Sequence, residues 1–147
     1  TGGSLSLLKS KNYGENLIVM NGDLITNFDF RNLVQEFKKT SSDLVVCVAN
    51  YQHQIPFGVI EKRGKKIKSL NEKPVLNFLI NAGIYMLSKK IIKNVKKERI
   101  DMTDIIYKEI KKGSVLETFK INEYWIDIGN KNDLSRANKD ISKKNAN

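Results

Sequence analysis

The apolar run from Asn16 to Met20, followed at once by Asn21, Gly22 and Asp23, constrains the fold of this chain more than any other stretch. Five residues without polar alternation predict a β-strand that is buried on both faces. Open α/β sheets bind ligands at the carboxyl ends of such strands, which is where Asp23 would lie. We therefore predict a chemical role for Asp23; the alternative is that Asn-Gly-Asp is a plain polar turn.

The segment after Asp23 predicts a helix and then a second strand. Asp29 is placed to cap a helix over Phe30 to Lys39, where apolar residues recur at helical spacing and lysines end the helix. Asp43 to Ala49 is another apolar run and predicts a buried strand. The order strand, helix, strand implies a right-handed crossover in a mostly parallel sheet, so we expect an α/β fold.

The rest of the chain predicts further short elements within one domain over residues 1–147. Turn residues, caps and apolar periodicity place them. They are a short helix before Lys11, a ribbon of Phe57–Glu61 and Lys66–Leu70, a strand at Ile84–Leu87, a helix after Ser88, a helix at Asp104–Lys112 capped by Thr103, strands at Ser114–Lys120 and Glu123–Ile126, and a terminal helix opened by Asp133.

The composition limits the classes of partner that the chain is expected to bind. The chain has 26 basic and 16 acidic residues, a formal net charge of +10, which favours anionic ligands. The lysines are scattered and no nucleic-acid motif accompanies them, so we expect a solvated basic surface; a nucleic-acid binder, with steeply salt-dependent affinity, is the alternative. Cys47 is the only cysteine, and no stretch has the length of a membrane span, so we expect a cytoplasmic protein without membrane or nucleic-acid partners.

A second aspartate, Asp127, stands like Asp23 after an apolar stretch and close to a glycine. Carboxylates at the ends of neighbouring strands can share one divalent cation and leave coordination positions for phosphate oxygens. Lys73, stiffened by Pro74, could place a positive charge beside a phosphate, although it could equally be a surface lysine. Side-chain and backbone groups suited to sugar hydroxyls are also present, at Gly58, Glu72 and Asn81.

Five short motifs, in their order and spacing, resemble the sugar-1-phosphate nucleotidyltransferases. The resemblance runs from nearly the first residue to the helix at Asp133. The residues of the motifs are most similar to those of the mannose-1-phosphate guanylyltransferase branch. The motifs are Asn21-Gly-Asp23, Pro56-Phe-Gly58-Val, Asn71-Glu-Lys73-Pro74, Asn81-Ala-Gly83-Ile-Tyr85 and Trp125-Ile-Asp127-Ile-Gly129.

The resemblance implies a Rossmann-like domain that joins a nucleoside triphosphate, with a leaning to GTP, to a sugar 1-phosphate and releases pyrophosphate with Mg²⁺. Such a protein serves nucleotide-sugar biosynthesis, for example for bacterial cell-surface polysaccharide. The implied roles are metal binding and catalysis for Asp23 and Asp127, catalytic phosphate binding for Lys73, sugar binding for Gly58, Glu72, Asn81 and Gly83, and nucleotide binding for Thr1, Gly2 and Gly3.

The chain departs from the family pattern at its amino-terminal end. The family has a first strand and a Gly-rich loop with an Arg and a Pro-Lys-Pro, and this sequence contains neither. We therefore expect the carboxyl-terminal two-thirds of one domain, with little or no transferase activity by itself. The alternative is a non-catalytic sugar-nucleotide-binding or regulatory module. The oligomeric state stays open, with a homo-oligomer among the alternatives.

Overall fold

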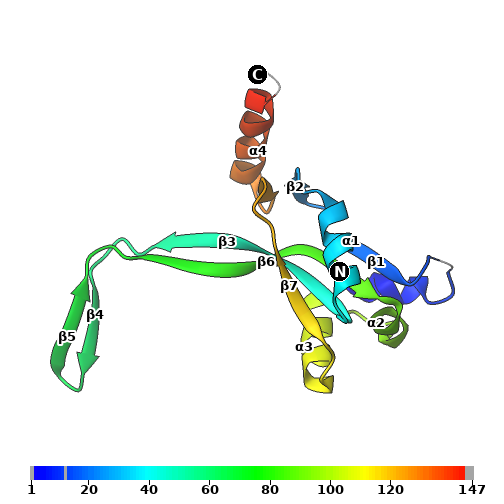
Figure 1. Cartoon of the computed structure of the whole chain (residues 1–147). Coiled ribbons are helices and arrows are strands. Elements are labelled where there is room, and N and C mark those ends of the chain that lie inside the picture. The colour runs from blue at the N-terminus through cyan, green and yellow to red at the C-terminus, as the bar shows by residue number, and fades with distance from the viewer. Residues whose placement is uncertain (1, 12, 145–147) are drawn as a thin grey trace.

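The computed structural model describes residues 2–11 and 13–144 and has a four-stranded sheet at its centre (Figure 1). Across the sheet the strands are β1 (Asn16–Met20), β6 (Val75–Ser88), β3 (Leu44–Gln54) and β7 (Leu116–Lys120). β6 is antiparallel to β1 and β3, whereas β3 and β7 are parallel. Three strands therefore share one direction, and β6 reverses it because it returns from a hairpin that follows β3. The expected α/β class is confirmed, with a mixed sheet.

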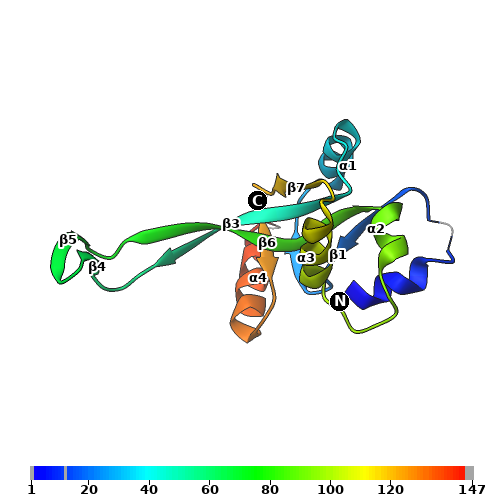
Figure 2. The same ribbon diagram turned by 90° about the horizontal axis from the view of Figure 1, so that it is seen from below.

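Helices cover both faces of this sheet (Figure 2). On one face α1 (Phe30–Lys39) packs Leu33 and Phe37 into a core that includes Cys47 of β3. On the other face η1, a 3₁₀ helix (Gly2–Leu8), α2 (Lys89–Asn94) and α3 (Met102–Lys112) close a second core. Alternate residues of the inner strands point to the two cores, which explains why their sequences are continuously apolar.

β1 differs from the expectation of full burial. Ile18 packs against one core and Leu17 and Val19 pack against the other, so both faces of the strand are used. The three residues nevertheless remain half-buried, and Met20 is 39% exposed. The reason is topological, because β1 is an edge strand among the described strands and has β6 on one side only.

Two helix starts also differ from the sequence prediction. Asp29 does cap α1, since its Oδ1 accepts a hydrogen bond from Arg31 N at 2.9 Å. The N-cap of α3, however, is Asp101 and not Thr103, and Asp104 Oδ2 accepts from Asp101 N at 3.0 Å. The terminal helix α4 (Lys131–Lys144) begins before Asp133 and is capped by Asn130. In both cases an Asp or Asn acceptor lies slightly upstream of the predicted start.

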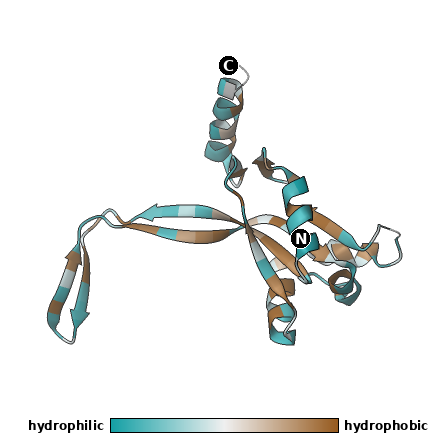
Figure 3. Ribbon diagram, in the orientation of Figure 1, coloured by the Kyte–Doolittle hydropathy of each residue, from teal (hydrophilic) through white to brown (hydrophobic). Residues whose placement is uncertain are grey.

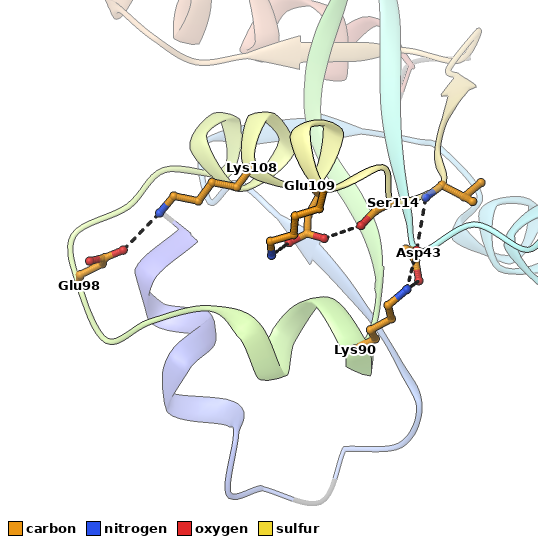
Figure 4. A network of polar contacts seen from close by, with 8 residues as sticks. Asp43, Lys90, Glu98, Lys108, Glu109 and Ser114 are labelled. Carbon is orange, nitrogen blue, oxygen red and sulfur yellow. Dashed lines mark hydrogen bonds and ion pairs between the residues drawn. The ribbon is translucent and has the colours of Figure 1, made fainter.

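A polar network fixes the start of β3 to its neighbours (Figure 4). Both carboxylate oxygens of Asp43 accept from Lys90 Nζ at 3.0 Å, and Val115 N also donates to Asp43. Nearby, the buried Glu109 carboxylate pairs with Lys112 and accepts from Ser114 Oγ at 2.7 Å. These contacts join the start of β3 to α2 and brace the end of α3, so they support the body of the protein.

A long ribbon leaves the body on one side, and we call residues 50–79 the arm (Figure 1). It consists of the outer part of the β3–β6 ladder and a hairpin of β4 (Val59–Arg63) and β5 (Lys66–Asn71), which confirms the predicted ribbon. Many large apolar side chains along it are exposed, and Figure 3 shows brown segments on both parts of the ribbon. Few elements of the described chain cover the arm, so its shape depends mainly on its own strand pairs.

A second small sheet of β2 (Leu24–Thr26) and β8 (Trp125–Asp127) lies beside α4. The sequence did not predict β2, because three residues are too few to show a period. Within the described chain, none of the helices has both the length and the apolar character needed to cross a membrane.

Candidate functional site

Asp23 and Asp127, far apart in sequence, lie side by side in the fold. β2 starts directly after Asp23, and β8 ends at Asp127, where Leu24 pairs with Asp127 in an antiparallel register. Ile128 N donates to the Asp23 carbonyl at 2.9 Å, which joins the two loops directly. Both aspartates are exposed. The two acids are therefore held on neighbouring strands, with their carboxylates open to a ligand.

The electrostatics of Asp127 reflect this proximity. The pKa of the Asp127 carboxyl is raised above its usual value, first by partial desolvation in its loop and then by repulsion from Asp23 and Asp133. Repulsion from a like charge at short range disfavours the charged form of Asp127. A bound cation would relieve that repulsion, so the site is electrostatically suited to positive charge.

The donor set fits a hard divalent cation that also binds substrate. Within residues 2–11 and 13–144, no group of three or more His, Cys, Asp or Glu side chains is arranged to hold a metal ion. Asp23 and Asp127 alone would therefore leave most coordination positions for other oxygens. Mg²⁺ commonly binds in this way, through one or two carboxylates together with water and substrate phosphates.

The segment Asn81–Gly83 of β6 lies against both aspartate loops. Trp125 Nε1 donates to the Ala82 carbonyl at 2.9 Å, and Asn21 N donates to the Gly83 carbonyl at 2.9 Å. Gly83 has φ +69°, and a Cβ there would lie 2.7 Å from Asn21 Nδ2, so glycine is required both by conformation and by space. Asn81 itself accepts from Gly83 N at 3.0 Å and donates to the Tyr85 hydroxyl at 2.8 Å. Two predicted sugar-binding residues, Asn81 and Gly83, thus lie close to the aspartates.

The other predicted substrate residues gather on the arm, where the ladder meets the hairpin. A Cβ at Gly58 would lie 2.8 Å from Glu72 Oε2, so these two residues are in contact. Lys73 N donates to the Phe57 carbonyl at 3.3 Å. Gly58, Glu72 and Lys73 therefore form a second cluster, and all three are exposed.

Lys73 has an unusual backbone. Its φ of 46° makes it the one non-glycine residue with a positive φ in the part of the chain that the structure describes. A side-chain-bearing residue in this region is strained, and glycine would occupy it more easily. The strain does not explain why lysine is present, but it shows that local backbone preference did not select it.

The two clusters are separated along β6. Lys73 lies just before β6 and Asn81 lies well inside it. An extended strand rises about 3.3 Å per residue, so the stretch between Val75 and Asn81 alone spans roughly 20 Å. The structure therefore brings Asn81 and Gly83 to the aspartates, but it does not bring Gly58, Glu72 or Lys73 to them (Figure 1).

The amino-terminal glycines lie elsewhere. Gly3 N donates to the Ile100 carbonyl at 2.9 Å, and a Cβ at Gly2 would lie 2.7 Å from Ile105 Cδ1. Both glycines thus let η1 pack closely on the start of α3. This packing is a structural reason for glycine that the sequence motif did not reveal. Thr1, the third residue predicted to bind nucleotide, lies outside the described residues.

Sequence reasoning assigned no hydrogen-bonding role to two residues at the site. Asn21 and Trp125 each donate to the Asn81–Gly83 segment, and each lies two residues before one of the aspartates. This equal spacing was visible in the sequence. Its meaning was not, because it depends on one strand, β6, that passes beside both loops.

Comparisons with known proteins find related sequences and a solved structure with the same fold. A family profile described as Nucleotidyl transferase matches residues 4–144. The bifunctional protein GlmU of Methanococcus aeolicus is 33% identical over 97% of this chain and 36% of its own length. A mannose-1-phosphate guanyltransferase of Yarrowia lipolytica is 28% identical over 79% of this chain and 33% of its own length.

A solved structure with the same fold comes from Bacillus anthracis and is assigned as a glucose-1-phosphate thymidylyltransferase. It superposes with a TM-score of 0.67 at 26% identity, and the match covers 95% of this chain and 59% of that one. The chain thus spans about a third of the length of these curated relatives.

Proposed function

Because this chain belongs to the nucleotidyl transferase family, we propose that it forms the metal-binding and sugar-phosphate-binding part of a sugar-1-phosphate nucleotidyltransferase. The observation that carries the proposal is the meeting of Asp23 and Asp127 on paired strands, beside Asn81 and Gly83. Carboxylates that share a cation at a phosphate are what nucleotidyl transfer needs, because charge accumulates on the phosphate oxygens.

In this proposal Asp23 and Asp127 hold Mg²⁺, which when bound neutralises charge on the triphosphate. The sugar phosphate oxygen attacks the α-phosphorus, the bond to the β-phosphate breaks, and pyrophosphate leaves. The residues of this chain orient the two reactants, and no side-chain nucleophile is used. Asn81 and Gly83 would line the sugar pocket.

Lys73 contributes a positive charge to the sugar phosphate in this scheme, although it lies on the arm. One phosphate cannot reach both Lys73 and the aspartates in the extended shape, so the proposal requires the arm to bend toward the body. The β3–β6 ladder shifts register between Val46 and Val48, on the body side of the arm, and a β-bulge there bends the strand that carries it.

Spin labels test the bending. Cys47 is fully buried, and burial raises the pKa of its thiol to about 12, so it will not react with labels. In a double variant with Lys65→Cys on the arm and Asn132→Cys on α4, the distance between labels should shorten when Mg²⁺, triphosphate and sugar 1-phosphate are added together. An unchanged distance would remove Lys73 from the scheme and leave the aspartates in it.

The test of the function itself is ligand binding to the folded chain. A thermal-shift panel of sugar 1-phosphates and nucleotide sugars should raise the melting temperature only with Mg²⁺, because ligands that bind the native state stabilise it. Asp127→Asn should abolish the shift. If no sugar phosphate shifts the wild-type melting temperature with Mg²⁺ at any concentration tested, the chain is instead the non-catalytic regulatory module.

Turnover by the chain alone should be small, because it contains no Gly-rich loop with an Arg and a Pro-Lys-Pro to cradle the triphosphate. Pyrophosphate release measures this, and rapid release would contradict it. For specificity we propose guanylyl transfer within nucleotide-sugar biosynthesis. The residues of the Asn81–Tyr85 and Trp125–Gly129 motifs, which resemble those of the mannose-1-phosphate guanylyltransferase branch, support this proposal. GTP should then shift the melting temperature more than UTP or dTTP.

A further inference from the structure

We infer that Trp125 is a positioning residue: its indole N–H bond to the Ala82 carbonyl fixes where the Asp127 loop lies relative to Asp23. The bond is 2.9 Å long and joins β8 to β6 across 43 sequence positions. The inference rests on the proposed metal site, and it concerns what sets the geometry of that site.

Two successive carbonyls of β6 hold the two aspartate loops. The Ala82 carbonyl accepts from Trp125, two residues before Asp127, and the Gly83 carbonyl accepts from Asn21 N, two residues before Asp23. The bond from Ile128 N to the Asp23 carbonyl then closes a ring of hydrogen bonds. The ring adds β6 as a third anchor to the β2–β8 residue pairs, and together they set the relative position of the carboxylates.

The Ala82 carbonyl is available because the strand ladder is interrupted there. β3 pairs Val46 with Tyr85 and Val48 with Asn81, and the register shifts between these pairs. β1 pairs only as far as Ile84. Ala82 has no partner in the printed register of β3 or β1 and is fully buried, so its carbonyl is suited to accept from a donor outside the ladder. The indole N–H, which can only donate, supplies it.

Trp125 also anchors a sheet that is weak by itself. Two-stranded sheets are marginal in water without further packing. β2 and β8 make three residue pairs, and Leu24 and the ring of Trp125 pack against the core of the body. These apolar contacts are not directional, whereas the indole bond specifies one position along β6. Residues 125 and 127 lie on the same face of β8, so a displacement of the indole moves the carboxylate with it.

The test compares Trp125→Phe with Tyr124→Phe. The first removes the indole N–H and keeps an aromatic ring; the second removes the hydroxyl that donates to Asp140 at 3.0 Å on α4. Trp125→Phe should weaken Mn²⁺ binding, measured by electron paramagnetic resonance, roughly tenfold, as for other residues that orient metal ligands. Tyr124→Phe should bind Mn²⁺ like the wild type. Equal Mn²⁺ affinity in all three proteins overturns the inference.

Amide exchange separates this inference from the proposed function. If the wild type binds no Mn²⁺, the metal site is wrong, and exchange at Ile128 then decides whether Trp125 positions the loops. Trp125→Phe should accelerate exchange of the Ile128 amide while β3 and β6 amides keep their rates; unchanged Ile128 exchange overturns the inference.

A third measurement needs no variant. Trp125 is the only tryptophan, so the wild type gives one indole N–H signal. Slow exchange of that proton supports the bond to Ala82. Exchange as fast as in a free indole overturns the inference, whether or not Trp125→Phe folds.

Discussion

The aspartate site and the arm cluster are built by different means. Asp23 directly precedes β2 and Asp127 ends β8, and both strands are tied to a third segment, Ala82–Gly83, by hydrogen bonds between residues far apart in sequence. Gly58, Glu72 and Lys73 are held by contacts within one exposed ribbon, and Lys73 keeps a strained backbone there. The comparison teaches that long-range contacts in the body fix the positions of its site residues relative to one another. In the arm, only local contacts hold the site residues.

The largest expected difference is in metal affinity. Asp23→Asn removes a direct ligand from the proposed site and should weaken Mn²⁺ binding more than about 100-fold, beyond the loss caused by residues that only orient ligands. Lys73→Ala on the arm should leave Mn²⁺ affinity unchanged. Titration followed by electron paramagnetic resonance measures both. A comparable loss in the two variants would mean that the arm already lies at the metal, and the separation described here would be wrong.

Substitutions at two glycines with positive φ, one in the body and one in the arm, allow the effects on stability in the two regions to be compared. Gly83→Ala places a Cβ 2.7 Å from Asn21 Nδ2 at φ +69°, whereas Gly64→Ala at φ +60° meets no atom within 4 Å. The left-handed conformation costs about 1–2 kcal/mol in both, and overpacking adds about 1–3 kcal/mol at Gly83 only. Urea unfolding should therefore show the larger loss for Gly83→Ala. Equal losses of stability would indicate that the loop at Asn21 moves without cost to make room for the added Cβ.

A carboxylate in the body, Asp127, should also make the stability of the protein depend on pH. Because the pKa of Asp127 is raised in the folded protein, the folded state binds more protons than the unfolded state between the two pKa values. Ionised Asp127 therefore costs stability above its folded pKa, and the cost disappears as the pH falls to the ordinary carboxyl value of about 3.9.

Asp127→Asn should accordingly raise the free energy of unfolding at pH 7 and lose this advantage near pH 3.5, close to that ordinary carboxyl value. Denaturant titrations at several pH values measure it, with Glu72→Gln on the arm as the control. Mg²⁺ should stabilise the wild type but not Asp127→Asn. An advantage that persists unchanged at low pH would show that ionisation of Asp127 is not its cause.

Much of the body could be predicted from sequence. The continuous apolar runs of β1 and β3 and the periodic face of α1 identify elements that a two-sided sheet requires, and α1 has the predicted bounds Phe30–Lys39. The reversed direction of β6 could not be predicted, because strand direction depends on where the chain returns from the arm and not on local pattern. β2 was missed for its length alone.

The two halves of the candidate site were predictable to different degrees. Asp23 and Asp127 were expected to meet because each was placed at the end of a predicted strand. They meet in a different way, since Asp127 ends β8 and β8 pairs with β2, the strand that the sequence did not predict, and not with β1. The distance from them to Lys73 could not be predicted, because it depends on how straight β6 runs over Val75 to Asn81. The packing of Gly2 and Gly3 on α3 was equally hidden, since a glycine motif looks the same whether a ligand or a helix approaches it.

The smallest expected effect concerns the strain at Lys73. Lys73→Gly relieves a positive φ that costs about 1–3 kcal/mol for a residue with a Cβ, but glycine adds about 0.5–1 kcal/mol of backbone entropy to lose on folding. The net change should be a gain of about 1 kcal/mol in the free energy of unfolding, measured in urea, together with weaker sugar-phosphate binding. Lys65→Gly, next to the turn at Gly64, is the matched control: it should lose stability and keep sugar-phosphate affinity. If both variants lose stability equally, the backbone at Lys73 is not strained, and the contrast drawn here between the arm and the body loses that support.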